Sequence, residues 1–260
     1  YKADFIYDNL SIAVNTIEAA RKFGVETLVN LGSSCIYPKE ALQPIREEYL
    51  LSGYLESTNE PYAIAKIAAL KLCSFYREQH HKRFFSLMPC NLYGLNDNFD
   101  FERSHVLPAL VRKIILAKLL QHENFEFIRN DLTKRPLPTH PKAYTYNNKH
   151  IVEILEEIGI KPNKVTLWGS GLPRREFLHA DDAADAVLFF LDSTYQFDFL
   201  NIGYGRDVSI KELAGIIADT VQWNGEFDFD RSKPDGTLRK LMDSTKAHDM
   251  GWTPKISLHE

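Results

Sequence analysis

Residues 25–35 read Val-Glu-Thr-Leu-Val-Asn-Leu-Gly-Ser-Ser-Cys, and this stretch decides the fold. The run from Val25 to Leu31 is short, apolar and rich in β-branched residues, which is typical of a buried strand in a parallel sheet. It ends at Gly32, and small polar residues follow, as at a transition from strand to loop. The sequence therefore predicts a buried parallel strand whose carboxyl end carries Ser33.

The segments on either side alternate between helical and strand patterns. Apolar residues recur every three or four positions from Asp4 to Phe23, which predicts an amphipathic helix. A second helix is expected from Tyr62 to His80 and a second strand from Phe84 to Met88. This alternation predicts an α/β fold with a doubly wound, parallel, Rossmann-type sheet. Ligands bind at the carboxyl ends of the strands in such sheets, which makes Ser33 and Asn91 candidate site residues.

The pattern changes beyond Asn96. Residues 121–149 are polar and contain three prolines, so we interpret them as a loop or an insertion, and we expect an insertion to extend over about 121–164. Ser209 followed by Glu212 has the spacing of a capping box. The remaining expected elements are helices over 105–120, 151–158, 181–191 and 209–220 and strands over 165–168 and 199–203.

Composition narrows the class of protein. The 260 residues are 44% hydrophobic and 25% charged, as in an ordinary globular protein, and the net charge is −4. This charge argues against binding to nucleic acid or to an anionic membrane surface. No run of about 18 apolar residues predicts a spanning helix, and no signal-peptide pattern opens the chain. The three cysteines, Cys35, Cys73 and Cys90, match no zinc pattern, and we expect no metal and a reducing, cytoplasmic compartment.

Tyr62 and Lys66 form the first chemical motif. Their four-residue interval places both side chains on one face of a helix. A nearby ammonium favours a phenolate, so Lys66 is expected to lower the pKa of Tyr62 and make it a proton donor to a carbonyl oxygen. The pair alone is common on helix surfaces and carries little specificity.

Ser33 makes the motif specific. A serine at a strand end, followed by Tyr-x-x-x-Lys on the next helix, resembles the triad of the short-chain dehydrogenase/reductase superfamily. The stretches 31–38, 58–66 and 88–94 resemble its extended branch, which acts on nucleotide sugars. Three further stretches, 96–109, 168–179 and 232–240, are similar to the GDP-L-fucose synthase family of 3,5-epimerase-4-reductases.

The resemblance implies an activity and its residues. An enzyme of this family epimerises two carbons of GDP-4-keto-6-deoxy-D-mannose and then reduces the 4-keto group with hydride from NADPH. Cys35 and His105 match the epimerisation pair, and a neighbouring cation would favour the Cys35 thiolate. Which of the two is base and which is acid stays open.

The resemblance also implies the binding residues. The catalytic residues would be Ser33, Tyr62, Lys66, Cys35 and His105. The NADP contacts would be Leu31, Gly32, Ser33, Ser34, Lys66, Pro89, Cys90, Asn91, Leu92 and His105. The GDP-sugar contacts would be Lys113, Trp168, Arg175 and Asp235.

The glycine-rich dinucleotide turn is not found in the sequence. We therefore expect a chain truncated at its N-terminus, lacking the first βαβ units of a Rossmann-type sheet. Residues 1–95 with about 178–203 would form a partial NADP-binding domain. A smaller substrate-binding domain would comprise about 96–177 and 204–260. By resemblance we expect a homodimer.

Two alternatives stay open. One is another nucleotide-sugar epimerase or dehydratase of the same superfamily, which the Cys35 and His105 pair argues against. The other is a non-catalytic, truncated remnant that binds a nucleotide sugar or a partner protein, which the complete triad argues against.

Overall fold

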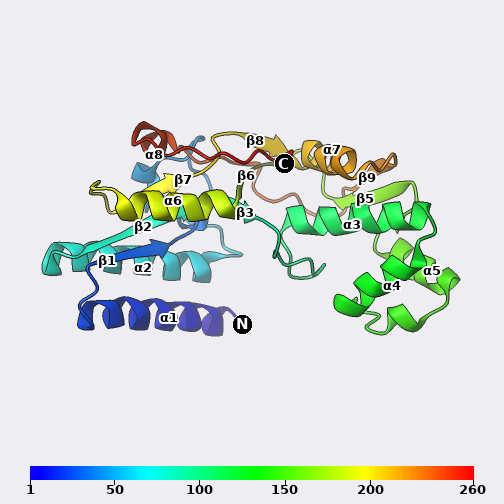
Figure 1. Cartoon of the computed structure of the whole chain (residues 1–260), viewed down its shortest axis with the longest axis horizontal. Helices are drawn as coiled ribbons and strands as arrows, with labels where there is room; N and C mark the ends of the chain where they lie inside the picture. The colour runs from blue at the N-terminus through cyan, green and yellow to red at the C-terminus, as the bar shows by residue number, and fades with distance from the viewer.

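A three-stranded parallel sheet forms the centre of the first part of the chain. The computed structural model describes residues 1–260. Strands β1 (Thr27–Leu31), β2 (Arg83–Pro89) and β7 (Phe199–Ile202) pair in the order β1-β2-β7. Helix α2 (Glu60–His80) contacts β1 and β2, and α6 (Ala180–Asp192) also contacts β1. The helices lie on either side of the sheet (Figure 1), which confirms the α/β fold with a parallel sheet.

Helix α1 (Lys2–Lys22) packs against α2 and lies outermost in this part of the molecule (Figure 1). The Tyr76 hydroxyl of α2 donates to Glu18 of α1 at 2.6 Å. Gly24 follows the helix with a φ of +72°, a conformation that glycine adopts without strain, and so lets the chain turn back into β1. The turn directs β1 toward the loop that carries Ser33.

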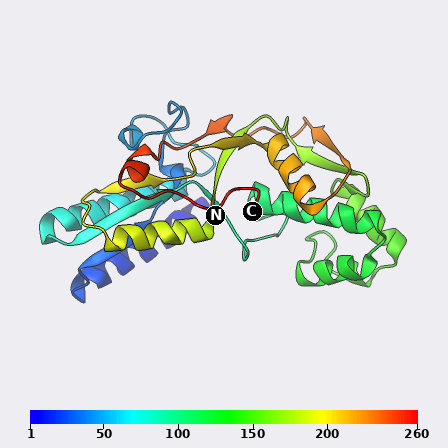
Figure 2. The same cartoon turned by 45° about the horizontal axis from the view of Figure 1, so that its top comes forward.

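A second sheet lies where the two parts of the molecule meet. Strands β3 (Asn91–Tyr93), β6 (Arg174–His179) and β10 (Arg239–Lys240) pair in parallel, and β8 (Asp207–Ser209) runs antiparallel to β6. In Figure 2, the chain crosses between the two lobes beside both termini. This sheet therefore connects the three-stranded parallel sheet to the second lobe.

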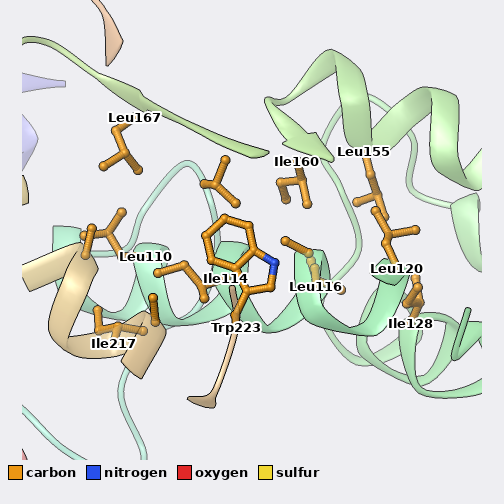
Figure 3. Packing of buried hydrophobic residues seen from close by; sticks show 14 of the residues in the cluster. Leu110, Ile114, Leu116, Leu120, Ile128, Leu155, Ile160, Leu167, Ile217 and Trp223 are labelled. Carbon is orange, nitrogen blue, oxygen red and sulfur yellow. The ribbon is translucent and has the colours of Figure 1, made fainter. Parts of the chain in front are cut away.

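The second lobe is built around helix α3 (Val106–Gln121). Strands β4 (Ile160–Lys161), β5 (Lys164–Trp168) and β9 (Glu226–Asp230) form its sheet. Helix α7 (Ile210–Val221) packs on α3 and begins with the expected capping box between Ser209 and Glu212. Figure 3 shows Trp223 set among the aliphatic side chains of this core.

The loop interpretation of residues 121–149 is wrong. They contain helix α4 (Phe125–Lys134) and a 3-10 turn, η3 (Ala143–Thr145), before α5 (Asn148–Glu157). Asn124 caps α4 through its side chain, and Ile128 and Leu132 are buried. Ile128 lies beside Leu120 of α3 in Figure 3. Helix α4 thus extends the core of the second lobe.

The remaining elements are short. They are η1 (Ser34–Ile36), η2 (Glu47–Tyr49) and α8 (Thr245–Asp249). None of the helices has the length and apolar character that crossing a membrane would require.

Candidate active site

A cavity of about 880 Å³ opens at the carboxyl ends of β1 and β2. Its position is the one that a parallel α/β sheet offers to ligands. Ten of the predicted site residues line it: Gly32, Ser33, Ser34, Cys35, Tyr62, Pro89, Cys90, Asn91, Leu92 and His105. The fold therefore brings together residues from four separate segments of the sequence.

The predicted reductase triad comes from two neighbouring elements: Ser33 lies just beyond β1, and Tyr62 and Lys66 lie in α2. Ser33 follows β1 with extended backbone, and its hydroxyl oxygen accepts the backbone N–H of Cys35 at 3.2 Å. Tyr62 and Lys66 lie one turn apart near the start of α2, with the Lys66 ammonium 5.6 Å from the centre of the phenol ring. That ammonium donates to the carbonyl oxygen of Leu31 at 2.9 Å. The hydrogen bond fixes Lys66 against the end of β1.

The pKa of Tyr62 is raised, so the expectation that Lys66 lowers it is wrong for this structure. Burial is the largest cause, the charge of Cys35 adds to it, and a hydrogen bond with Ser33 opposes it. Burial also lowers the pKa of Lys66. A phenol with a raised pKa stays protonated near neutral pH, which is the form that a proton donor needs.

Cys35 and His105 reach the same cavity from different elements. Cys35 lies in η1, and His105 directly precedes the first residue of α3. The Lys240 ammonium lies 3.6 Å from Cys35 Sγ, within hydrogen-bonding distance of sulfur. Of the three free thiols, only that of Cys35 is partly accessible, since Cys73 is 0% and Cys90 7% exposed.

A hydrogen bond to Glu176 of β6 holds the segment after β2 in place. Asn91 donates its side-chain amide to the carbonyl oxygen of Glu176 at 2.8 Å. Glu176 itself is fully buried, and its carboxylate accepts the backbone N–H groups of Gly205 at 2.7 Å and Met242 at 3.0 Å. Burial raises the pKa of Glu176 to about 7. It also raises the pKa of the adjacent Cys90 thiol, which the charge of Glu176 raises further.

Trp168, Arg175 and Asp235 lie outside the cavity lining, around the end of β5 and the start of β6. The Trp168 ring is 69% exposed, with the Lys233 ammonium 5.4 Å from its centre. The Asp235 carboxylate accepts the backbone N–H and the hydroxyl of Ser170, which lower its pKa. The Arg175 guanidinium donates to the carbonyl oxygen of Thr237 at 2.6 Å. Burial lowers the pKa of Arg175.

Lys113 lies apart from both groups of residues. Its ammonium donates to the carbonyl oxygens of Ile158 and Thr166, each at 3.1 Å. Burial lowers its pKa to about 8. In this structure Lys113 ties α3 to the segments on either side of β4.

Sequence reasoning missed several residues of the cavity. Phe5 of α1 lines it, and its ring lies 5.9 Å from that of Tyr62. Asp97 and Thr58 also line the cavity. Thr58 and Asp97 lie in the motif stretches 58–66 and 96–109, which is the signal that could have found them. Lys240 contacts Cys35 without lining the cavity, and it closes the Asp-Gly-Thr-x-Arg-Lys motif at residues 235–240.

A serine at the end of a strand, with a tyrosine and a lysine one turn apart on the next helix, defines an enzyme of the short-chain dehydrogenase/reductase class. The sequence profile described as "NAD dependent epimerase/dehydratase family" matches residues 1–137 and 139–203. The chain is 48% identical over 260 residues to the putative GDP-L-fucose synthase 2 of Arabidopsis thaliana, covering 100% of this chain and 67% of that protein. The chain belongs to the NAD dependent epimerase/dehydratase family and, within it, to the GDP-L-fucose synthase group.

Solved structures agree with this assignment. The Campylobacter jejuni GDP-D-glycero-L-gluco-heptose synthase, crystallised in the presence of NADPH, is 39% identical with a TM-score of 0.85. The alignment covers 100% of this chain and 74% of that one. A GDP-L-fucose synthetase from Naegleria fowleri bound to NADP is 26% identical with a TM-score of 0.77, over 99% of this chain and 70% of that one.

Proposed function

We propose that this chain carries the active site of an NADP-dependent epimerase-reductase that converts GDP-4-keto-6-deoxy-D-mannose to GDP-L-fucose. One observation carries the proposal. A single cavity collects the groups for reduction, Ser33 and Tyr62, together with a thiol and an imidazole, Cys35 and His105. A reductase alone needs only the first set, whereas epimerisation beside a ketone needs two further groups that exchange protons.

The residues at the end of β1 fit the nicotinamide end of NADP(H). The Lys66 ammonium is fixed at the edge of β1 by the carbonyl oxygen of Leu31. Pro89, Asn91 and Leu92 line the cavity from the neighbouring strand β2 and the segment after it. When bound, NADPH supplies the hydride. Lys66 would hold the ribose hydroxyls, and Gly32, Ser34 and Cys90 would flank the nicotinamide.

Tyr62 is the proton donor in the reduction. Its raised pKa keeps the phenol protonated near neutral pH. The proton goes to the oxygen at carbon 4 as negative charge develops there. The Ser33 hydroxyl orients the same oxygen by a hydrogen bond.

Cys35 and His105 carry the epimerisation. One of them removes a proton from a carbon beside the ketone, and the other returns a proton to the opposite face. The enolate formed between these steps is stabilised by donors at the carbonyl oxygen. Tyr62 and Ser33 are the donors that the cavity provides.

The GDP part of the substrate would bind along Trp168, Arg175 and Asp235. Trp168 offers an exposed aromatic face. Arg175 offers a planar guanidinium, which suits a diphosphate. Lys113 was predicted to bind the GDP-sugar as well. Its contribution to binding stays a prediction, which the KM for the substrate tests.

The organisation of the chain is also a proposal. Residues 1–95 with 178–203 would form the NADP-binding part and the remainder the substrate-binding part. The largest hydrophobic core lies wholly within the remainder, whereas the core of the first part also takes in Met242, Ala247 and Trp252 from the C-terminal segment. We propose a homodimer in the cytoplasm, where the three free thiols would stay reduced. Light scattering on the purified protein tests the oligomeric state.

The function is tested by incubating the purified protein with GDP-4-keto-6-deoxy-D-mannose and NADPH. We expect NADPH oxidation and a product that NMR identifies as GDP-L-fucose. Cys35→Ser should stop exchange of the protons beside the ketone in heavy water while reduction of the unepimerised ketone continues. Cys73→Ser, at a buried position away from the cavity, is the matched control. Absence of NADPH oxidation by the unmodified protein refutes the proposal.

A second candidate is favoured by the similarity to GDP-heptose enzymes. The C. jejuni heptose synthase matches the whole chain at 39% identity. A GDP-4-keto-heptose differs from the 6-deoxy sugar beyond carbon 5, so the same proton-transfer groups would serve both. Comparing kcat/KM for the two substrates decides between them, and a higher value for the heptose overturns the first assignment.

A further inference from the structure

Lys240 contacts Cys35, one of the cavity residues, from a part of the sequence far from the other site residues. It ends β10, which pairs in parallel with β6 so that Lys240 lies opposite Arg175. Its ammonium donates to Cys35 Sγ at 3.6 Å, across 205 residues of sequence. The pairing of β10 with β6 therefore places a cation beside the thiol that the proposed epimerisation uses.

The charge of Lys240 is not neutralised by a carboxylate. The preceding residue, Arg239, pairs with Asp207, and Asp207 also pairs with Arg174 at 2.7 Å. Lys240 takes part in no ion pair of the structure and is partly buried. Its positive charge is therefore available to the Cys35 sulfur.

The backbone directly after Lys240 is held by hydrogen bonds to two other segments of the chain. The N–H of Leu241 donates to the Gln43 side chain at 2.8 Å, and its carbonyl oxygen accepts the N–H of Ile45 at 2.8 Å. The N–H of Met242 donates to the buried carboxylate of Glu176 at 3.0 Å. These hydrogen bonds fix the backbone next to Lys240. The contact between the ammonium and the sulfur therefore does not require a flexible loop to become ordered.

Of the other titratable groups that line the cavity, Lys2 is a cation, and its ammonium donates to the carbonyl oxygen of Ser57 at 3.2 Å, not to the Cys35 sulfur. Tyr62 of α2 is a neutral phenol near neutral pH, and its pKa is raised in part by Cys35. His105 and Asp97 line the same cavity, the first cationic only when protonated and the second an anion when ionised. Lys240 is the one permanently cationic group with a contact to the sulfur near neutral pH.

We propose that Lys240 is a positioning residue that stabilises the thiolate of Cys35 and sets the pH range in which Cys35 exchanges protons with the substrate. This rests on the proposed function. The thiolate takes a proton from the carbon beside the ketone. The C–H bond breaks, an S–H bond forms, and the electron pair moves to the carbonyl oxygen as an enolate. His105 returns a proton to the opposite face of the carbon, and the Cys35 thiol releases its proton to solvent, which restores the thiolate beside the ammonium.

The test is the pH dependence of Cys35 alkylation by iodoacetamide, measured by mass spectrometry of the Cys35 peptide. Cys73 and Cys90 are buried, so they add little background, and Cys35→Ser measures it. In Lys240→Met we expect the midpoint of the rate-against-pH curve to move up by about one unit, with alkylation near pH 7 about tenfold slower. Lys240→Arg keeps the charge and should leave the midpoint close to that of the unmodified protein. Lys161→Met, at an exposed lysine of β4, is the control.

A midpoint that is unchanged in a folded Lys240→Met protein overturns the proposal. If that variant does not fold, the reciprocal measurement decides, because coupling between two charges acts on both. The Lys240 ammonium, labelled by ¹³C dimethylation and followed by NMR, should titrate at lower pH in Cys35→Ser than in the unmodified protein. Equal titration in the two proteins also overturns the proposal.

The alkylation assay needs no substrate, so the two proposals fail separately. A shifted midpoint in a protein that never oxidises NADPH with the keto sugar refutes only the proposed function. Normal turnover with an unshifted midpoint refutes only the role of Lys240. In an active protein, Lys240→Met should also move the pH profile of proton exchange beside the ketone, while reduction of the unepimerised ketone keeps its profile.

Discussion

Replacing the buried Glu176 should make the free energy of unfolding less dependent on pH, because ionisation of this carboxyl destabilises the folded protein. Burial raises the pKa of this carboxyl from its ordinary value of 4.5 to about 7. A carboxyl with a raised folded pKa holds its proton more tightly when folded. As the pH rises, the unfolded chain ionises first, so Glu176 lowers stability progressively between these two pKa values.

The magnitude follows from the two pKa values. Full ionisation in both states costs the folded protein about 3 kcal/mol, and about 2 kcal/mol of this falls between about pH 5.5 and about pH 8. Urea unfolding of the unmodified protein and of Glu176→Gln at these two pH values measures the change. The amide cannot ionise, so the stability of the unmodified protein relative to the variant should fall by about 2 kcal/mol toward the higher pH.

Near pH 5.5 Glu176 is a protonated carboxyl in the folded protein, and both of its oxygens carry lone pairs that can accept an N–H. The amide introduced by Glu176→Gln has only one acceptor oxygen, so the variant should be the less stable protein near pH 5.5. The two N–H donors are those of Gly205 and Met242, and one of them would face the amide NH₂ group. Glu157→Gln, at an exposed position of α5, controls for the loss of a carboxyl. A stability difference that is the same at both pH values refutes the assignment of a raised pKa to Glu176.

Three further predictions test the site and its framework. Tyr62→Phe removes the phenol proton and should lower kcat for NADPH-dependent reduction by about 10²-fold or more, measured with a pre-epimerised ketone so that Cys35 is bypassed; a rate within twofold of the unmodified protein would exclude Tyr62 as the donor. Lys113→Met leaves two carbonyl oxygens without their donor and should lower the free energy of unfolding by about 1–3 kcal/mol in urea; a tenfold rise in substrate KM with unchanged stability would instead assign Lys113 to substrate binding. Ser209→Ala removes the cap of α7 and should cost about 1 kcal/mol in thermal unfolding, whereas no change would contradict the capping box.

Helices could be predicted from the sequence where apolar residues recur at helical intervals. The helices that became α1, α2, α3 and α7 each repeat apolar residues at three and four positions, and the structure confirms them within a few residues. Helix α4 was missed because it is polar and short, and because three prolines just beyond it suggested a loop. Its two buried residues, Ile128 and Leu132, stabilise the helix only when they pack against the rest of the core, including α3. Strands of two residues, such as β10, are too short to show any period.

The site was predictable where its chemistry is local. Tyr62 and Lys66 share a helix, and Ser33 and Cys35 share a strand end, so spacing alone relates each pair. The shift of the Tyr62 pKa was predicted with the wrong sign because the sequence gives the neighbouring lysine but not the burial and the nearby Cys35 that raise this pKa. Lys240 could not be assigned, since only tertiary structure brings it to Cys35.

The register of β10 against β6 joins the two functions of the site. Pairing sets Lys240 opposite Arg175, while the loop before β10 gives the Thr237 carbonyl oxygen to the Arg175 guanidinium. A slip of one residue would turn Lys240 away from Cys35, because successive side chains of a strand point to opposite faces. It would also displace the carbonyl oxygen that holds Arg175. Asp207, which pairs with Arg174 and Arg239 on adjacent strands, resists such a slip. The proposed binding of the diphosphate by Arg175 and the proposed control of the Cys35 thiol by Lys240 thus depend on a single strand pairing, and a substitution that loosens it should impair substrate binding and proton exchange together.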